Sequence, residues 1–397
     1  MMKVLKWMIG LFFICLPLQI SANKEDMVSI KDGTFYDNGA QHTFQYKAFA
    51  MWYAPLLGQK GNKFGRERLH AELDSLHALG VNVVTCIAGL QVTQKSSHHN
   101  MSASDSCLTL CADEATLSGV DYLLAELQKR QMKAVITLDK APSNAVQKLE
   151  CYEKFITQML QHRNRFTKKM YVSDATIMAW NLCDVANEWT HPDSLTIYAD
   201  WVNRMSQRIR IYDSQHLITA PITPLQVNDE QQQRWLQQWV SCVSLNYVNV
   251  PIVPLTQNWV QAGNLFAGMS RVFLRFNDVC SLYDRTFSNA DMPYVVNISF
   301  PRDAMFKRPG STTEARDTFF GYVLSRAAQG VVENGDGALR GVTICGWGGM
   351  ARPNSQGEWT NSIDYSAEWF DEPKGSYAIF NCDNSTLGLI KKYFLDD

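Results

Sequence analysis

The sequence lacks the features that would point to a nucleic-acid partner, a membrane protein or a chain of several domains. Its 37 Lys and Arg nearly balance its 39 Asp and Glu, and the two signs are interspersed, so nothing favours nucleic acid or an anionic membrane as a partner. Beyond residue 22 no apolar run is long enough to cross a bilayer. No tract rich in Pro, Gly or Ser interrupts the chain, so residues 23–397 are predicted to fold as one domain.

The ten cysteines do not form the paired CxxC pattern of a structural zinc site, and we expect no metal. Cys107 and Cys111 stand together in the polar stretch SDSCLTLCADE. In an oxidising compartment these two could close a short disulfide. The sequence leaves open whether they pair.

The amino terminus is typical of a signal peptide. Lys3 and Lys6 precede an apolar run, residues 7–20, and a small residue, Ala22, stands at the expected cleavage site. The run is too short to span a bilayer. We therefore predict that residues 1–22 are removed and that the mature protein is secreted, either to a periplasm or outside the cell.

Apolar strands and amphipathic helices alternate through the rest of the chain. Two turn signals, Asp32-Gly33 and Asn38-Gly39, predict an N-terminal β-hairpin. After it, eight short apolar strands alternate with helical segments, which indicates an α/β fold with its parallel sheet closed as a (β/α)8 TIM barrel. A doubly wound open sheet is the alternative, but no Gly-rich phosphate loop follows any predicted strand.

In such a barrel the working residues lie at the carboxyl ends of the strands. Asn297 interrupts the otherwise apolar stretch YVVNI, residues 294–298. A polar side chain therefore lies near the carboxyl end of the predicted seventh strand. Reading every predicted strand to its end in this way gives the candidate site residues Trp52, Tyr53, Thr85, Asp139, Asp184, Val185, Asn246, Asn297 and Trp347.

Several blocks along the chain carry a family resemblance. In order they are VSIKDGTFYDNG, RERLHAELDSLHALGVN, DYLLAELQKRQMKAV, DATIMAWNL, FPRD followed by STTEARDTFF, GWGGMARP, and DEPKGSYAIFNCDNST. Together they cover essentially the whole mature chain, which resembles glycoside hydrolase family five in its endo-β-1,4-mannanase branch. The resemblance implies a secreted, retaining hydrolase without metal or cofactor, whose partner is a β-linked polysaccharide or oligosaccharide of the β-mannan type.

A retaining glycosidase uses two carboxylates roughly 5 Å apart, one as nucleophile and one as acid/base. The resemblance places the nucleophile in a motif like EFGYPRD that ends the seventh strand. Matching the stretch FPRD, residues 300–303, to that motif puts Asn297 at the nucleophile position. A neutral amide cannot form the glycosyl-enzyme ester, so the resemblance implies that this carboxylate has been lost.

The acid/base of the family belongs to an Asn-Glu pair that ends the fourth strand in a context like IMAWQLANEP. Matched without gaps, TIMAWNLCDV puts Asp184 and Val185 on that pair. A three-residue insertion would instead bring Asn187 and Glu188 to it. Both alignments stay open, and the second would leave the acid/base in place.

At other positions of the family site, charged or titratable residues are also replaced by neutral ones. The resemblance places Thr85 at an arginine of the second strand and Asn246 at a histidine of the sixth. The aromatic residues are kept, as Trp52 and Tyr53 after the first strand and as Trp347 on the eighth. We therefore predict that Trp52, Tyr53, Thr85, Asp184, Asn246 and Trp347 bind the sugar.

Three hypotheses follow from these substitutions. The first is a mannanase-like barrel that binds a β-linked glycan without cleaving it. The alternative is an active endo-β-1,4-mannanase with Glu188 as acid/base and Asp139 or Asp184 as nucleophile. A structural or interaction domain without a sugar ligand is the third.

Overall fold

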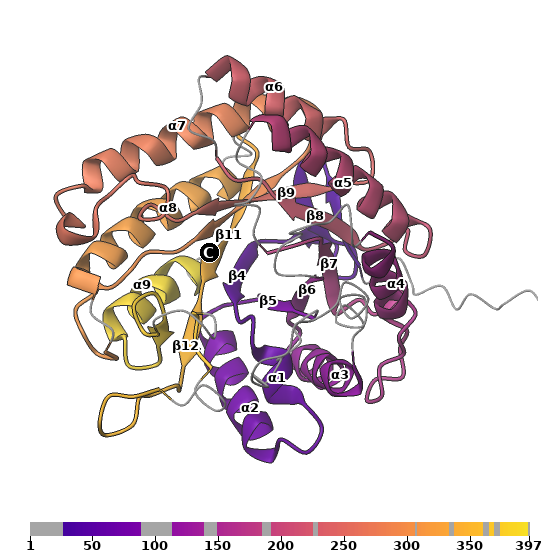
Figure 1. Ribbon diagram of the computed structural model, residues 1–397, viewed down its shortest axis with the longest axis horizontal. Helices are drawn as coiled ribbons and strands as arrows, with labels where there is room; N and C mark the ends of the chain where they lie inside the picture. The colour runs from indigo at the N-terminus through magenta and orange to yellow at the C-terminus, as the bar shows by residue number, and fades with distance from the viewer. Residues whose placement is uncertain are drawn as a thin grey trace, which may run out of the picture.

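The computed structural model describes residues 27–88, 113–138, 149–184, 192–224, 229–305, 308–332, 337–359, 365–368 and 374–395. Eight parallel strands close into a barrel in the order β10-β11-β4-β5-β6-β7-β8-β9 (Figure 1). They are β4 Tyr46–Ala50, β5 Val83–Ile87, β6 Lys133–Thr137, β7 Ile177–Asn181, β8 Leu217–Pro221, β9 Tyr247–Ile252, β10 Tyr294–Ile298 and β11 Leu339–Cys345. The prediction of a TIM barrel is confirmed.

Helices surround the barrel (Figure 1). The α-helices are α1 Ala54–Gly58, α2 Lys63–Ala78, α3 Glu114–Lys129, α4 Leu149–Leu160, α5 Pro192–Arg210, α6 Asp229–Val240, α7 Met269–Phe287, α8 Glu314–Val332 and α9 Asn384–Leu395. Short 3-10 helices cover Tyr171–Ser173, Ala262–Asn264, Ser288–Ala290 and Asp303–Met305. Within the described ranges no helix combines the length and apolar character of a membrane span.

The helix α2 shows how local sequence sets these elements. The Asn62 side chain accepts a hydrogen bond from the backbone N–H of Gly65 at 2.8 Å, which caps the amino end of the helix. Leu69, Leu73 and Leu76 follow at spacings of four and three and are fully buried. Beyond the last turn Gly80 has a φ of +83°, a conformation that glycine adopts without strain. The predicted helix with its glycine stop is confirmed.

A small antiparallel sheet closes the amino end of the barrel. It consists of β1 Val28–Lys31, β2 Thr34–Asp37 and β3 His42–Thr43, with Asp32 and Gly33 at positive φ in the first turn, as a tight hairpin requires. Phe35 on β2 is fully buried. Its ring lies 5.6 Å from that of Tyr46 and 5.1 Å from that of Tyr247, centroid to centroid. The sheet therefore covers the end of the barrel opposite the expected site.

The carboxyl-terminal part of the chain is tied to the barrel by buried charge. Strands β12 Trp347–Gly349 and β13 Ile379–Phe380 form a parallel pair. Next to them the carboxylate of Asp383 contacts the guanidinium groups of Arg302 and of Arg316, the latter at 3.1 Å. Both arginine side chains are fully buried. This cluster connects α8, α9 and the segment that follows β10.

Candidate functional site

Two layers of side chains fill the barrel. An apolar cluster at the amino end of the barrel includes residues from seven barrel strands, among them Val83, Val135, Ala179, Leu217, Tyr247 and Val295. Because side chains alternate between the two faces of a strand, the residue two positions later also points into the barrel. These next residues are Thr85, Thr137, Asn181, Thr219, Asn249 and Asn297, which we call the polar layer.

Hydrogen bonds connect five of the six side chains of the polar layer, all except Thr85. Asn297 donates from Nδ2 to Oδ1 of Asn249 at 3.1 Å. Asn249 donates in turn to Oδ1 of Asn181 and to the hydroxyl of Thr219, both at 3.2 Å, and Asn181 donates to Thr137 Oγ1 at 3.0 Å. Strand β8 separates β9 from β7 in the sheet. The bond between Asn249 and Asn181 therefore passes through the barrel interior.

The eight barrel strands, all of them described, contain no Asp, Glu or His. Their charged residues are Lys47, Lys133 and Arg340, each the first or second residue of its strand and so near the amino end of the barrel. The polar layer is thus neutral. Carboxylates for acid-base or nucleophilic chemistry would have to come from the segments that follow the strands.

Asp184 is such a carboxylate. It follows β7 and is half-buried. Burial, together with the charge of Asp184, raises the pKa of the Cys345 thiol at the end of β11, so the two side chains are close enough to interact. Asp184 thus lies beyond the carboxyl end of β7, and its role in sugar binding stays a prediction.

Two further predicted residues lie where the sequence placed them. Asn297 is the fourth residue of β10, in register with Pro251 of β9 and Thr343 of β11. Thr85 lies in β5 beside Ala50 of β4. Both are half-buried and belong to the polar layer. Their placement inside the barrel fits a binding role, which the structure does not test.

The predicted placement of Asn246 is wrong. This residue directly precedes β9 and so lies at the amino end of the barrel. Its Oδ1 accepts hydrogen bonds from the Arg210 guanidinium and from the backbone N–H of Ile218, the latter at 2.8 Å. These bonds hold the entry to β8 and β9. Asn249 is the residue of β9 that reaches the polar layer.

The three predicted aromatic residues are buried. Trp52 is 6% exposed and donates from Nε1 to the carbonyls of Ser366 and Ala367 at 2.8 and 3.0 Å. Trp347 is 1% exposed, with its ring edge-on to Phe49 at 5.4 Å. Neither indole presents an exposed face in this structure. A sugar would stack on them only after neighbouring segments move, and their binding role stays a prediction.

Tyr53 belongs to a buried hydrogen-bonded cluster. Its hydroxyl oxygen lies 3.1 Å from Glu72 Oε2 and 3.2 Å from the Trp347 carbonyl oxygen, and its one proton is shared between these two acceptors. Arg68 donates to the same hydroxyl and to Glu72 Oε1. Burial raises the pKa of Glu72, and the Arg68 charge opposes that rise. These contacts connect α2 to β12, so the structure gives Tyr53 a place in the core.

Several predictions fall outside the described residues. They concern the signal peptide at residues 1–22, the possible disulfide between Cys107 and Cys111, and the three candidate site residues Asp139, Val185 and Glu188. Among the residues that are described, no three Asp, Glu, His or Cys side chains lie close enough together to hold a metal ion. The expectation that the protein uses no metal or cofactor stays a prediction.

Sequence reasoning missed most of the polar layer. It found Asn297 and Thr85 but neither Asn181 nor Asn249. The signal was present, since Asn249 interrupts the apolar stretch YVNVPI in the way that Asn297 interrupts YVVNI. Reading each strand with a period of two, rather than only to its last residue, would have found both.

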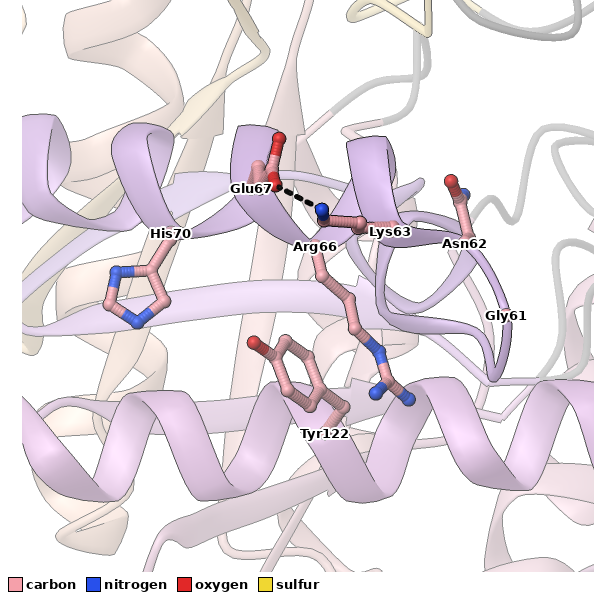
Figure 2. A pocket seen from close by; sticks show the side chains of 7 residues that line it. All are labelled: Gly61, Asn62, Lys63, Arg66, Glu67, His70 and Tyr122. Atoms are coloured by element: carbon pink, nitrogen blue, oxygen red, sulfur yellow. Dashed lines mark ion pairs between the residues drawn. The ribbon is translucent and has the colours of Figure 1, made fainter.

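A cavity of about 460 Å³ lies on the outer surface, between the start of α2 and α3 (Figure 2). The Arg66 guanidinium covers the Tyr122 ring at 4.2 Å and donates from Nε to the Gly58 carbonyl at 2.9 Å. Lys63 and Glu67 form an exposed ion pair at 3.9 Å beside it. The lining residues include none from a barrel strand, so this cavity is separate from the polar layer.

Known proteins share this chain's fold and, more distantly, its sequence. Mannan endo-1,4-beta-mannosidase 3 from Solanum lycopersicum is 23% identical over 240 residues, 53% of this chain and 55% of that protein. Mannan endo-1,4-beta-mannosidase 1 from Arabidopsis thaliana is 24% identical over 237 residues, 52% of this chain and 54% of that protein. The chain spans about half the length of these curated relatives.

Solved structures extend the similarity over nearly the whole chain. The glycoside hydrolase family 5 mannosidase from Rhizomucor miehei superposes with a TM-score of 0.75 at 16% identity, over 94% of this chain and 97% of that one. The endo-beta-1,4-mannanase from Thermotoga petrophila gives a TM-score of 0.59 at 15% identity, over 89% of this chain and 76% of that one. At these identities the likeness establishes the barrel fold.

Family membership comes from the sequence match. Residues 25–146 and 140–396 match the family described as "GH family 5 beta-mannosidase-like". The two matched stretches together cover almost all of the chain. The chain therefore belongs to the beta-mannosidase-like branch of glycoside hydrolase family 5.

Proposed function

We propose that this barrel binds a β-mannan-type glycan at the carboxyl ends of its strands and does not cleave it by the retaining mechanism. The observation that carries the proposal is Asn297. The resemblance assigns its position to the nucleophile, and the residue is an amide bonded to the amide of Asn249 at 3.1 Å.

The chemistry explains why this residue decides between binding and hydrolysis. A retaining glycosidase forms a covalent ester between the sugar and a carboxylate, about 5–5.5 Å from a second carboxyl group that acts as acid and base. An amide forms no such ester. The strand residues around Asn297 include no acid that could replace it.

The proposed ligand class follows from the family. The curated relatives are named mannan endo-1,4-beta-mannosidases, and one solved relative is a mannosidase in complex with mannosyl-fructose. A neutral polar layer suits neutral sugars, because amides and hydroxyls can pair with sugar hydroxyls without a counterion. We also propose that the protein is secreted, where such a polysaccharide is met.

An active endo-β-1,4-mannanase is the second candidate, and the comparisons by themselves favour it over a protein that only binds. In that case Glu188 is the acid/base and Asp184 or Asp139 the nucleophile. Asp184 supports this candidate to the extent that it lies at the carboxyl end of the barrel, close to Cys345.

Hydrolysis and binding measured on the same preparation separate the candidates. We expect no release of reducing ends from β-1,4-mannan, and calorimetric binding of mannohexaose with a Kd of roughly 10 μM to 1 mM. Release of mannooligosaccharides that Glu188→Gln abolishes would establish the hydrolase instead. If neither release nor binding is found, the barrel is a structural or interaction domain.

A further inference from the structure

The amide of Asn297 stands at one end of a row of hydrogen-bonded amides. Its Nδ2 group donates to Asn249 Oδ1, and the Nδ2 groups of Asn249 and Asn181 donate onward along the polar layer. Asn249 and Asn181 each use the side-chain oxygen as the acceptor for the preceding amide, and all three amides use the nitrogen as the donor to the next group. Turning the Asn297 amide over alone would place its oxygen opposite that of Asn249, so the orientation of Asn297 is tied to that of the other two amides.

With the amides in this direction, the oxygen at the start of the row has no amide to accept from. In the described part of the chain, Oδ1 of Asn297 has no hydrogen-bond partner although it is shielded from solvent. An unpaired, buried acceptor is unfavourable in the folded state, and most buried polar atoms have a partner. The Asn297 side chain as a whole is half-buried, so the residue is not sealed in the core.

The neighbouring strands do not supply the missing donor within the described residues. Pro251, the register partner on β9, has no backbone N–H and an apolar side chain. Thr343, the register partner on β11, has its hydroxyl paired with the hydroxyl of Tyr46 at 3.2 Å. Each residue beside Asn297 is thus unable to donate or already paired. The unpaired oxygen is therefore a property of the folded barrel.

We propose that Asn297 Oδ1 is the acceptor for a hydroxyl group of the bound sugar, and that Asn249, backed by Asn181 and Thr137, is its positioning residue. The inference rests on the proposed glycan binding, and it names the protein atom that accepts a hydrogen bond from the sugar. A site with a pre-oriented acceptor selects ligands that can donate a hydrogen bond at that point. The unfavourable free energy of the unpaired oxygen is relieved when the sugar binds.

The test uses mannohexaose titrated by calorimetry into the full-length mature protein and its variants. Asn297→Leu removes the acceptor and should weaken binding about tenfold or more. Its thermal unfolding midpoint should stay within a few degrees of the wild type, because the change removes one unpaired oxygen and leaves another, that of Asn249. Asn277→Leu is the matched control on the exposed face of α7, and it should leave the affinity unchanged.

A double-mutant cycle tests the positioning role. Asn249→Leu alone should weaken binding, but added to Asn297→Leu it should weaken binding no further, because its effect acts through the Asn297 amide. If Asn249→Leu does not fold, the milder Asn249→Ser takes its place in the cycle. Effects that add fully would show that Asn249 acts independently and would overturn its positioning role.

The outcomes also separate this inference from the proposed function. Binding by the wild type that Asn297→Leu leaves within twofold refutes the role of Oδ1 and keeps glycan binding intact. Absence of binding by the wild type itself refutes the glycan-binding function, and this inference with it.

Discussion

Replacing Asp213 with asparagine should destabilise the protein in a pH-dependent way. Asp213 is buried between β7 and β8, where its Oδ2 accepts hydrogen bonds from Trp180 Nε1 at 2.7 Å and from His216 Nδ1 at 2.6 Å. The other ring nitrogen of His216 faces the Asp174 carbonyl at 3.0 Å. The His216 ring therefore lies between two oxygen atoms, and the Asp213 carboxylate is one of them.

The magnitude follows from the pKa of Asp213. Burial raises it, but the charge of His216 and the hydrogen bonds from His216 and Trp180 outweigh burial and lower it from 3.8 to about 2. That difference corresponds to roughly 2 kcal/mol of unfolding free energy at neutral pH. Because the folded pKa is the lower one, this stability is fully present above about pH 5. It is lost as the pH falls, about half of it by pH 3.

Urea unfolding at pH 7 and pH 3 measures both effects. Asp213→Asn keeps the shape and an acceptor oxygen but loses the charge, so we expect roughly 2 kcal/mol less stability than the wild type at pH 7. At pH 3 this difference in stability should narrow to about half. Asp200→Asn, which changes an exposed carboxylate on α5, should shift stability by less than about 0.5 kcal/mol at either pH. A gap that is the same at both pH values would refute the ion-pair argument.

Three further outcomes are expected. Asn297→Glu alone should not create mannanase activity measured by reducing ends, since the new carboxylate would face the Asn249 oxygen, and turnover at ordinary glycosidase rates would contradict this. Gly119→Ala should lower the free energy of unfolding in urea by about 1–3 kcal/mol, because its Cβ would lie 2.0 Å from the Pro55 carbonyl oxygen. The control Gly388→Ala, whose Cβ has no atom of another described segment within 4 Å, should be neutral or stabilising. Equal effects of the two variants would be inconsistent with the close approach of α1 and α3. Tyr53→Phe should lower the thermal unfolding midpoint and cost about 1–3 kcal/mol, because Glu72 and the Trp347 carbonyl both lose its hydroxyl; an unchanged midpoint would show that these bonds add little.

The barrel was predictable because the sequence shows the alternation of short apolar strands and amphipathic helices. Strands such as VVTCI and KAVIT, residues 83–87 and 133–137, are short apolar runs between helices with apolar spacings of three and four. Alternation of this kind has few compact solutions, and a closed parallel sheet is one of them. The position of Asn297 followed from the same pattern, since β10 has the bounds that the stretch YVVNI suggested.

The sixth strand shows where such reading fails. CVSLNY, residues 242–247, looks like a strand, and Pro251 and Pro254 look like its end. The strand instead begins at Tyr247 and runs through Pro251 to Ile252, because residues 242–246 are held in a turn by bonds such as that from Ile218 N–H to Asn246. That bond joins segments far apart in sequence, so no local pattern announces it.

The burial of the aromatic residues was not predictable for the same reason. Trp52 is covered by backbone around Ser366 and Ala367, more than three hundred residues later in the chain. A tryptophan after a barrel strand looks the same in sequence whether its face is open or covered. Only the tertiary contacts distinguish the two.

The closure of the barrel has a consequence for how the chain is made. Strand β4 lies between β5 and β11, and the Phe35 ring packs on Tyr247, so the earliest strands find part of their partners only in the second half of the chain. Contacts of such long sequence separation make folding slow and leave strand edges unpaired meanwhile. During synthesis the amino-terminal strands therefore lack part of their pairing partners and stay accessible to chaperones or to other chains until β11 has been made. The pairing of β4 with β11 can form only after all eight barrel strands have been synthesised.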